Sequence, residues 1–248
     1  HFTVATKQPA MTAARFAEAV EKNPQGKTLN MKLAQLLVDV FRSQSVAVLG
    51  NVVVAMGLAA LIAFVYQHQT GEPLMNSEKI AYQLHRIDPL DGSLWFAAIA
   101  GVWLFCSGII SGYFDNRSNY LNMRMRLAQH PLLKKLMSEK SRVKFANYMH
   151  ENYGSLIGNF CFGMLLGLTG LVGYLTHLPL DIRHVAFSSA NLGYSAVSGQ
   201  FAYPFFLQCI AFVLLIGLVN LMVSFSLTLW VALRSLNTEI DSWWPIWH

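Results

Sequence analysis

Long runs of apolar residues alternate along this chain with shorter polar segments. Four runs are long enough to cross a bilayer as helices, because about 20 apolar residues span roughly 30 Å of hydrocarbon. They lie at about 46–66, 94–114, 155–175 and 204–234, and their interiors contain no charged residue. The pattern predicts an all-α, polytopic integral membrane protein whose four transmembrane helices, with amphipathic interfacial helices, form a domain over 46–234.

The composition agrees with a membrane protein. Apolar residues make up 54% of the 248 residues and charged residues 12%, whereas an average soluble domain has about 25% charged residues. The high hydrophobicity also excludes a disordered chain. The three cysteines are odd in number and lie within apolar runs, so we expect small apolar side chains and no disulfide scaffold at Cys106, Cys161 and Cys209.

Lysine and arginine are distributed unequally between the polar segments. Fifteen of the eighteen lie in segments 1–45 and 115–153 or at Arg234, and three lie in segments 67–93 and 176–203. Because basic segments stay on the cytoplasmic side, we expect both termini in the cytoplasm of a bacterial inner membrane. Anionic lipid headgroups are the expected partners of the basic side.

The two terminal segments are expected to lie on this cytoplasmic side. In 1–45, Thr12 can cap a helix over 13–22, and Thr28 can cap an amphipathic helix that lies on the membrane or leads into the first span. The tail is 235–248. The chain begins with His1 and not Met, which we interpret as the C-terminal portion of a longer protein.

The cytoplasmic loop 115–153 is dense in basic side chains. Pro131 is expected to start a helix, so the loop should hold two short helices joined at this proline. The new helix would carry the candidate lipid-headgroup or phosphate-binding residues Lys134, Lys135, Lys140, Arg142 and Lys144. The same surface suits an acidic partner or DNA phosphates, although phosphate contacts alone carry no sequence information.

Glycines recur in and just before the third predicted span. Gly154 and Gly158, and Gly163 and Gly167, are each four residues apart and share a helix face. This spacing predicts close helix packing, with a lipid or conduction groove as the alternative.

The polar residues within the spans are uncharged. They are Asn51, Gln208, Asn220, Ser224 and Ser226. Ion-coupled transport usually requires ionisable side chains at this depth, so we expect these residues to make hydrogen bonds between helices.

The outer segment 176–203 is apolar for a loop. We expect a short interfacial or partly re-entrant helix after Pro179, capped by Asp181. With Asp181, the residues Arg183 and His184 form a compact polar cluster, expected to be a structural ion pair with a ligand or headgroup contact as the alternative. The eight histidines lack the spacing of metal ligands, so we expect neither a metal nor another cofactor.

Several segments resemble the bacterial membrane proteins labelled site-specific recombinases, of the gonococcal recombinase type. The segments are KQPAMTA (7–13), SGYFDNRSNY (111–120), LAQHP (127–131), LPLDIRHVAFSSAN (178–191) and GLVNLMVSFSLTLWVALRS (217–235). The resemblance covers most of the chain and implies a longer protein with a cytoplasmic N-terminal portion. By its label, it also implies a role in DNA recombination.

Recombination chemistry requires a nucleophilic Tyr or Ser among Arg and His side chains that neutralise the scissile phosphate. The local candidates are Tyr120, or Tyr113 in its place, with Arg117, Arg124, Arg126 and His130. They lie at the end of a span, where interfacial Tyr and juxtamembrane Arg are expected without catalysis. The sequence therefore contains no catalytic motif that supports the label.

Three functional hypotheses follow. The first is a non-enzymatic inner-membrane module that packs with copies or partner proteins and binds lipid. The second is a membrane-tethered DNA recombination factor that uses loop 115–153. The third is a transporter or channel component with a path past Asn51, Gln208 or Asn220.

Overall fold

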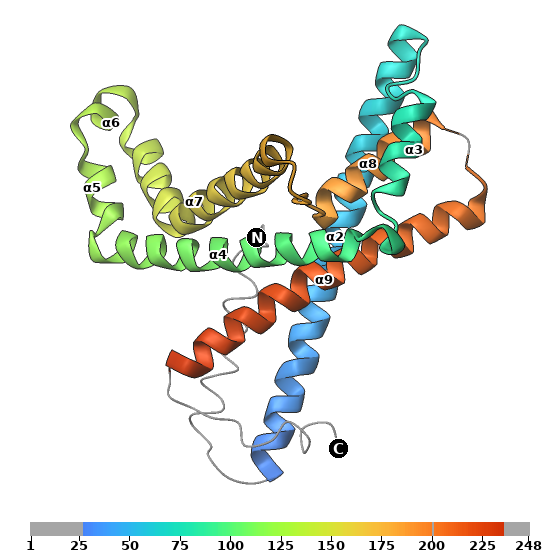
Figure 1. Ribbon diagram of the computed structural model, residues 1–248. Helices are drawn as coiled ribbons and strands as arrows, with labels where there is room; N and C mark the ends of the chain where they lie inside the picture. The colour runs from blue at the N-terminus through green and yellow to red at the C-terminus, as the bar shows by residue number, and fades with distance from the viewer. Residues whose placement is uncertain (1–26, 200, 236–248) are drawn as a thin grey trace.

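The structure is a computed structural model that describes residues 27–199 and 201–235, and every regular element in these ranges is helical (Figure 1). The long helices are α2 (Lys27–Thr70), α4 (Ser93–Tyr120), α7 (Glu139–Thr176) and α9 (Tyr203–Ser235). The short elements are α3 (Ser77–His85), the 3-10 turn η1 (Pro89–Asp91), α5 (Met123–Gln129), α6 (Pro131–Leu136) and α8 (Val185–Ser198). The predicted all-α class is confirmed.

Each long helix contains a segment that is long and apolar enough to cross a membrane. These segments are Ser45–Thr70, Ser93–Tyr120, Glu139–Thr176 and Tyr203–Ala232, and each contains most or all of a predicted span. The amphipathic helix expected from Thr28 is continuous with the first span, because α2 begins at Lys27. The helix expected over 13–22 lies outside the described residues.

The basic loop contains more helix than expected. Pro131 does start α6, but the expected extension of that helix through Lys144 is wrong. The backbone becomes extended at Met137, and the Ser138 hydroxyl then caps α7 by accepting the Ser141 N–H at 3.4 Å. A serine that satisfies a free N–H in this way favours a new helix start over continuation of α6.

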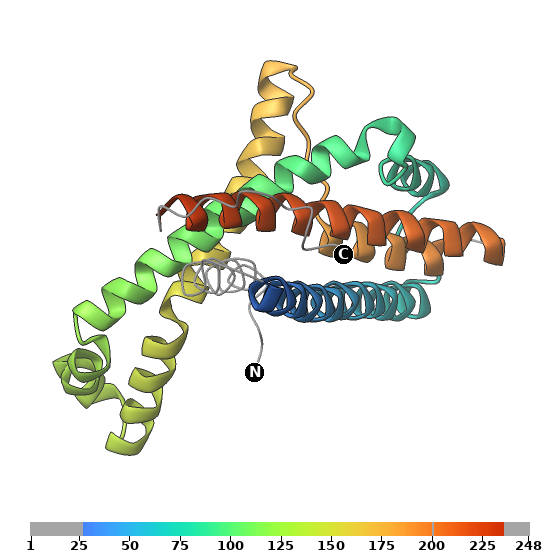
Figure 2. The ribbon, with the colours of Figure 1, turned by 90° about the horizontal axis from the view of Figure 1, so that it is seen from below.

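The helices form two pairs that α9 connects. Helix α4 packs along α7, and α8 packs along α2, while α9 contacts both α4 and α8. Figure 1 shows α5 and α6 joining the α4–α7 pair at one end of the molecule, and α2, α3 and α8 together at the other. Figure 2 shows α8 between α2 and α9.

The close approach of α4 and α7 depends on Gly154 and Gly158. A Cβ at Gly154 would overlap the Ser111 carbonyl oxygen and the Asp115 carboxylate, and one at Gly158 would lie 2.9 Å from the Ser111 Cβ. The short distance lets the Ser107 hydroxyl donate to the Gly158 carbonyl at 2.7 Å. Small residues therefore let these two backbones meet.

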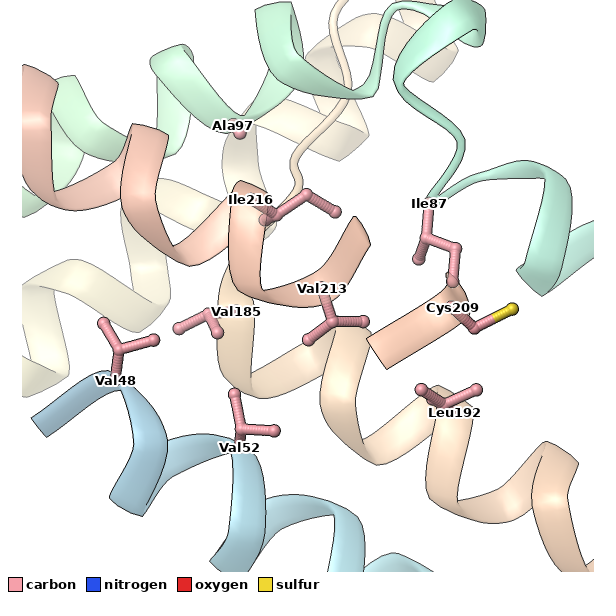
Figure 3. Close-up of a cluster of buried hydrophobic side chains, with 9 residues drawn as sticks. All are labelled: Val48, Val52, Ile87, Ala97, Val185, Leu192, Cys209, Val213 and Ile216. Atoms are coloured by element: carbon pink, nitrogen blue, oxygen red, sulfur yellow. The ribbon is translucent and has the colours of Figure 1, made fainter. Parts of the chain in front are cut away.

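An apolar core lies where α2, α8, α9 and the start of α4 meet (Figure 3). Its buried members are Val48, Val52, Ile87, Ala97, Val185, Leu192, Cys209, Val213 and Ile216. Figure 3 shows Val185 and Leu192 between the valines of α2 and the side chains of α9. Helix α8 is therefore a central part of the fold, whereas the sequence predicted a short interfacial or partly re-entrant helix within the outer segment 176–203.

The Gly154 contact can be tested with one methyl group. We expect Gly154→Ala to lower the free energy of unfolding by about 1–3 kcal/mol, because the Cβ overlaps backbone and carboxylate atoms. The matched control is Gly112→Ala in α4, where a Cβ would meet no atom within 4 Å. This control should be neutral or up to about 1 kcal/mol more stable because alanine favours helix. Equal unfolding curves for both variants in detergent would contradict the assignment.

Candidate functional site

The segment after α7 turns back along that helix before α8 begins. The ring of His184 lies 5.1 Å from that of Phe162, which precedes the end of α7 by fourteen residues, or about 21 Å of helix. Helix α8 then runs beside α2, with Gly193 against the Met56 carbonyl, and ends beside α3, where Gly199 contacts Ile80. The segment between α7 and α9 therefore returns alongside α7 and then packs along α2.

His184, and not Asp181, caps α8, so the predicted cap is wrong. The Nδ1 atom of His184 accepts the Ala186 N–H at 3.4 Å. Asp181 cannot act as the cap because its carboxylate accepts the N–H of the next residue, Ile182, at 2.7 Å and is held by two arginines. The helix consequently begins four residues after Asp181.

Asn220 of α9 satisfies the irregular backbone where α8 begins. Its side-chain oxygen accepts the Val185 N–H at 3.0 Å, and its amide nitrogen donates to the Ala97 carbonyl at 2.7 Å and the Arg183 carbonyl at 3.0 Å. Asn220 is 1% exposed. The hydrogen bonds expected of this amide between elements are therefore present, and they join α4, α8 and α9 at one point.

The polar cluster contains a residue that sequence reasoning missed. The Arg86 Nη2 atom donates to both oxygens of Asp181 at 2.8 and 2.9 Å, and the Arg183 Nη1 atom lies 2.6 Å from the second oxygen. The Arg183 Nε atom donates to the Arg86 carbonyl at 2.7 Å, and its guanidinium lies over the Phe96 ring. The sequence did offer one sign of the role of Arg86, since it is one of three lysines and arginines in the two predicted outer segments.

The surroundings fix the protonation of two groups in this cluster. Burial alone would raise the pKa of Asp181, but hydrogen bonds from Arg183 and the Ile182 N–H, with the two guanidinium charges, lower that pKa below its ordinary value. Burial lowers the pKa of His184 from 6.5 to about 4. Asp181 is therefore an anion and His184 a neutral ring at neutral pH.

A pocket of about 410 Å³ adjoins this cluster. Its polar wall includes the side chains of Gln83, Arg86, Asp181, Arg183, Ser188 and Asn191. The opposite wall is α7, where a Cβ at Gly163, Gly167 or Gly170 would meet no other atom of the described chain within 4 Å. The packing predicted for Gly163 and Gly167 is thus not made within the described residues, where these glycines line a pocket.

The basic residues of the predicted loop gather at the end of the α4–α7 pair, which we call the basic tip. It consists of α5, α6 and the first turns of α7. Lys134, Lys135, Lys140 and Lys144 are exposed there. The half-buried Arg142 donates from Nε to the Ala128 carbonyl at 2.6 Å, so it joins α5 to α7.

The candidate catalytic residues do not form a connected site. Tyr120 is 86% exposed at the end of α4, and the Arg117 Nη1 atom donates to the Tyr113 hydroxyl at 3.3 Å. Within the described ranges, no hydrogen bond joins Tyr120 to the other candidates, Arg117, Arg124, Arg126 and His130. The described hydrogen bonds therefore link Arg117 to Tyr113 and leave Tyr120 outside that link.

Another pair of polar side chains lies between α4 and α7. Ser118 Oγ lies 3.0 Å from His150 Nδ1, a pair that sequence reasoning missed, but Ser118 is only 2% exposed and a substrate cannot reach it. The residues described contain no group of three His, Cys, Asp or Glu side chains placed to hold a metal ion.

The Asn220 contacts predict a large effect of an apolar replacement. We expect Asn220→Leu to lower the free energy of unfolding by about 2 kcal/mol or more, because the buried Val185 N–H loses its acceptor. Asn51→Leu is the matched control, since Asn51 is only half-buried in α2, and its effect should stay within about 0.5 kcal/mol. Unfolding in a detergent titration measures both, and an unchanged Asn220→Leu would refute the contacts.

His184 predicts a dependence of stability on pH. The folded pKa lies below that of the unfolded chain, so the unfolded state binds the proton more tightly and stability falls as pH drops from 6.5 toward 4. His184→Asn keeps a capping side chain but has no proton to bind, and should lose this part of the slope. His177→Asn, at an exposed position, should retain it. The measurement is the unfolding midpoint against pH, and identical slopes in all three proteins would contradict the assignment.

Comparison with protein families matches the whole chain, residues 1–248, to the family described as site-specific recombinase. Comparisons with curated proteins and with solved structures give no match. The matched range includes every segment on which the sequence resemblance was based, so the resemblance is confirmed. On this evidence the chain, with its four long apolar helices, belongs to the site-specific recombinase family.

Proposed function

We propose that this chain is a non-enzymatic module of the inner membrane that assembles with further copies or partner membrane proteins and binds lipid. The observation that supports it is the uncovered apolar surface of the long helices. Between 22% and 39% of the residues in each membrane-crossing window are buried within the chain. On α2, large exposed side chains include Val53, Val54, Leu58, Leu61, Ile62 and Phe64. Such a surface requires lipid or another apolar helix.

The basic tip gives the module its orientation. We place it, with both termini, on the cytoplasmic side, where anionic headgroups attract juxtamembrane lysines by about 1 kcal/mol each. The exposed lysines Lys134, Lys135, Lys140 and Lys144 supply this attraction. The two segments predicted on the other side, 67–93 and 176–203, contain three lysines and arginines, Lys79, Arg86 and Arg183.

The assembly can be measured on the protein in nanodiscs and in mild detergent. We expect particles that contain more than one copy, or a copy with a partner protein, and phospholipid that remains bound through purification. Native mass spectrometry counts the chains and the lipid molecules directly. A single chain without bound lipid under every mild condition would reject the proposal.

The lipid part of the proposal has its own test. Phosphatidylglycerol should raise the unfolding temperature above that in phosphatidylcholine, because anionic headgroups pair with the basic tip. Replacing Lys134, Lys135, Lys140 and Lys144 together with Gln should remove most of this difference. Lys79→Gln, on α3, is the control for the loss of a single lysine charge. This variant should leave the difference in unfolding temperature between the two lipids unchanged. An undiminished difference in the fourfold variant would exclude the tip as the lipid site.

A second candidate is a membrane-tethered DNA recombination factor. The family membership and the exposed Arg124 and Arg126 at the basic tip favour it. Binding of duplex DNA to nanodisc-embedded protein should then weaken with salt. Arg124→Ala with Arg126→Ala should reduce the salt slope by about one for each of these arginines that binds a DNA phosphate. Absence of binding at low salt would exclude this function for the chain.

A further inference from the structure

We propose that the pocket between α7 and α8 binds the oxyanion headgroup of a membrane amphiphile, with the first part of its apolar tail against the glycines of α7. The pocket lies at the far end of α7 from the basic tip and shares no residue with it. Its volume of about 410 Å³ accommodates a headgroup and the start of a chain. The inference rests on the lipid-binding part of the proposed function and assigns it a second site, which stands even if the tip binds no lipid.

The charge of the pocket favours an anion. Two arginines and one aspartate line it, so one positive charge remains after the ion pairs are counted. Asp181 is already occupied by Arg86, Arg183 and the Ile182 N–H. Because an uncompensated charge is costly in an environment of low polarity, a bound anion stabilises the pocket.

The guanidinium of Arg86 has N–H groups that make no hydrogen bond within the described residues. Its Nη2 atom makes both hydrogen bonds to Asp181, whereas its Nη1 atom has no acceptor among the described residues and is not among the buried unpartnered atoms. The Nε and Nη1 atoms of Arg183, in contrast, are used by the Arg86 and Ile182 carbonyls and by Asp181. A guanidinium with a free N–H is suited to phosphate and carboxylate oxygens. Gln83, Ser188 and Asn191 on the same wall can bind the polar groups of the headgroup.

The other wall favours an apolar tail. Gly163, Gly167 and Gly170 present only backbone to the pocket, and the space beside them is open. At its edge, the side chains of Leu171 and Phe187 are 51% and 55% exposed. Both are large apolar residues, so the pocket is continuous with a surface suited to lipid. A ligand with a charged head and an apolar tail matches both walls, whereas a soluble anion matches only one.

The test measures retention of phosphatidylglycerol on the full chain by native mass spectrometry during titration of the lipid. Arg86→Gln removes the charge and the free donor. We expect its affinity to fall by at least about tenfold, as for the loss of one charge-assisted hydrogen bond. Lys79→Gln in the neighbouring α3 is the control for loss of a positive charge and should bind as the wild type does.

A second variant removes the space without changing the charge. Gly167→Leu projects a side chain into the open half of the pocket at an exposed position of α7, so the helix should fold normally. We expect a similar loss of phosphatidylglycerol. Gly112→Leu, at an equally open position in α4, should show none. Unfolding curves establish that all four variants are folded.

The outcomes separate the possible ligands and the two lipid sites. Wild-type retention in both Arg86→Gln and Gly167→Leu overturns the proposal. Displacement of the lipid by equal concentrations of inorganic phosphate overturns the amphiphilic ligand and assigns the pocket to a soluble oxyanion. If the fourfold Lys variant loses lipid while Arg86→Gln does not, the tip binds lipid and the pocket does not. The reverse pattern supports the pocket alone.

Discussion

The fold depends on the three hydrogen bonds of Asn220. An irregular backbone can lie among apolar helices only where its N–H and carbonyl groups find partners inside the protein. Asn220 provides an acceptor for the Val185 N–H and a donor for the Arg183 carbonyl, and at the same time reaches the Ala97 carbonyl of α4. One amide thus allows α8 to begin inside the apolar core and fixes three elements relative to one another.

The polar cluster and the core constrain each other. The guanidinium of Arg183 pairs with Asp181, and the carbonyl of Arg183 accepts a hydrogen bond from Asn220. A single residue therefore connects the charged cluster to the apolar core. Arg86 joins the same turn from the end of α3, through both its side chain and its carbonyl. Segments that the sequence separates by 95 residues are therefore held by a few directed bonds, and the pocket follows from that arrangement.

The long helices were predictable because length and hydropathy are local properties. The cap of α8 and the partner of Asp181 were not, because Arg86 and Asp181 meet only through the tertiary fold. The glycines show most clearly that local sequence does not specify which element a helix face contacts. Gly154 and Gly158 have the same spacing as Gly163 and Gly167, yet the first pair contacts α4 and the second lines the pocket. The spacing specifies a smooth helix face, and the neighbouring elements decide whether a helix or a ligand lies against it. Of the candidate site, the sequence therefore predicted the pair of Asp181 and Arg183, but not Arg86, the packing of His184 against Phe162, or the cavity.

The position of Asn220 also constrains the order of synthesis and insertion. The ribosome makes α8 before it makes the middle of α9, because Asn220 follows Val185 by 35 residues. Until α9 is inserted, the Val185 N–H lacks this acceptor and α8 lacks one wall of its core. The bond between α8 and Asn220 can therefore form only after the middle of α9 has been made. A chain that ends before α9 has α2 for α8 to pack along, but it lacks the one side chain that binds both the Val185 N–H and the Arg183 carbonyl.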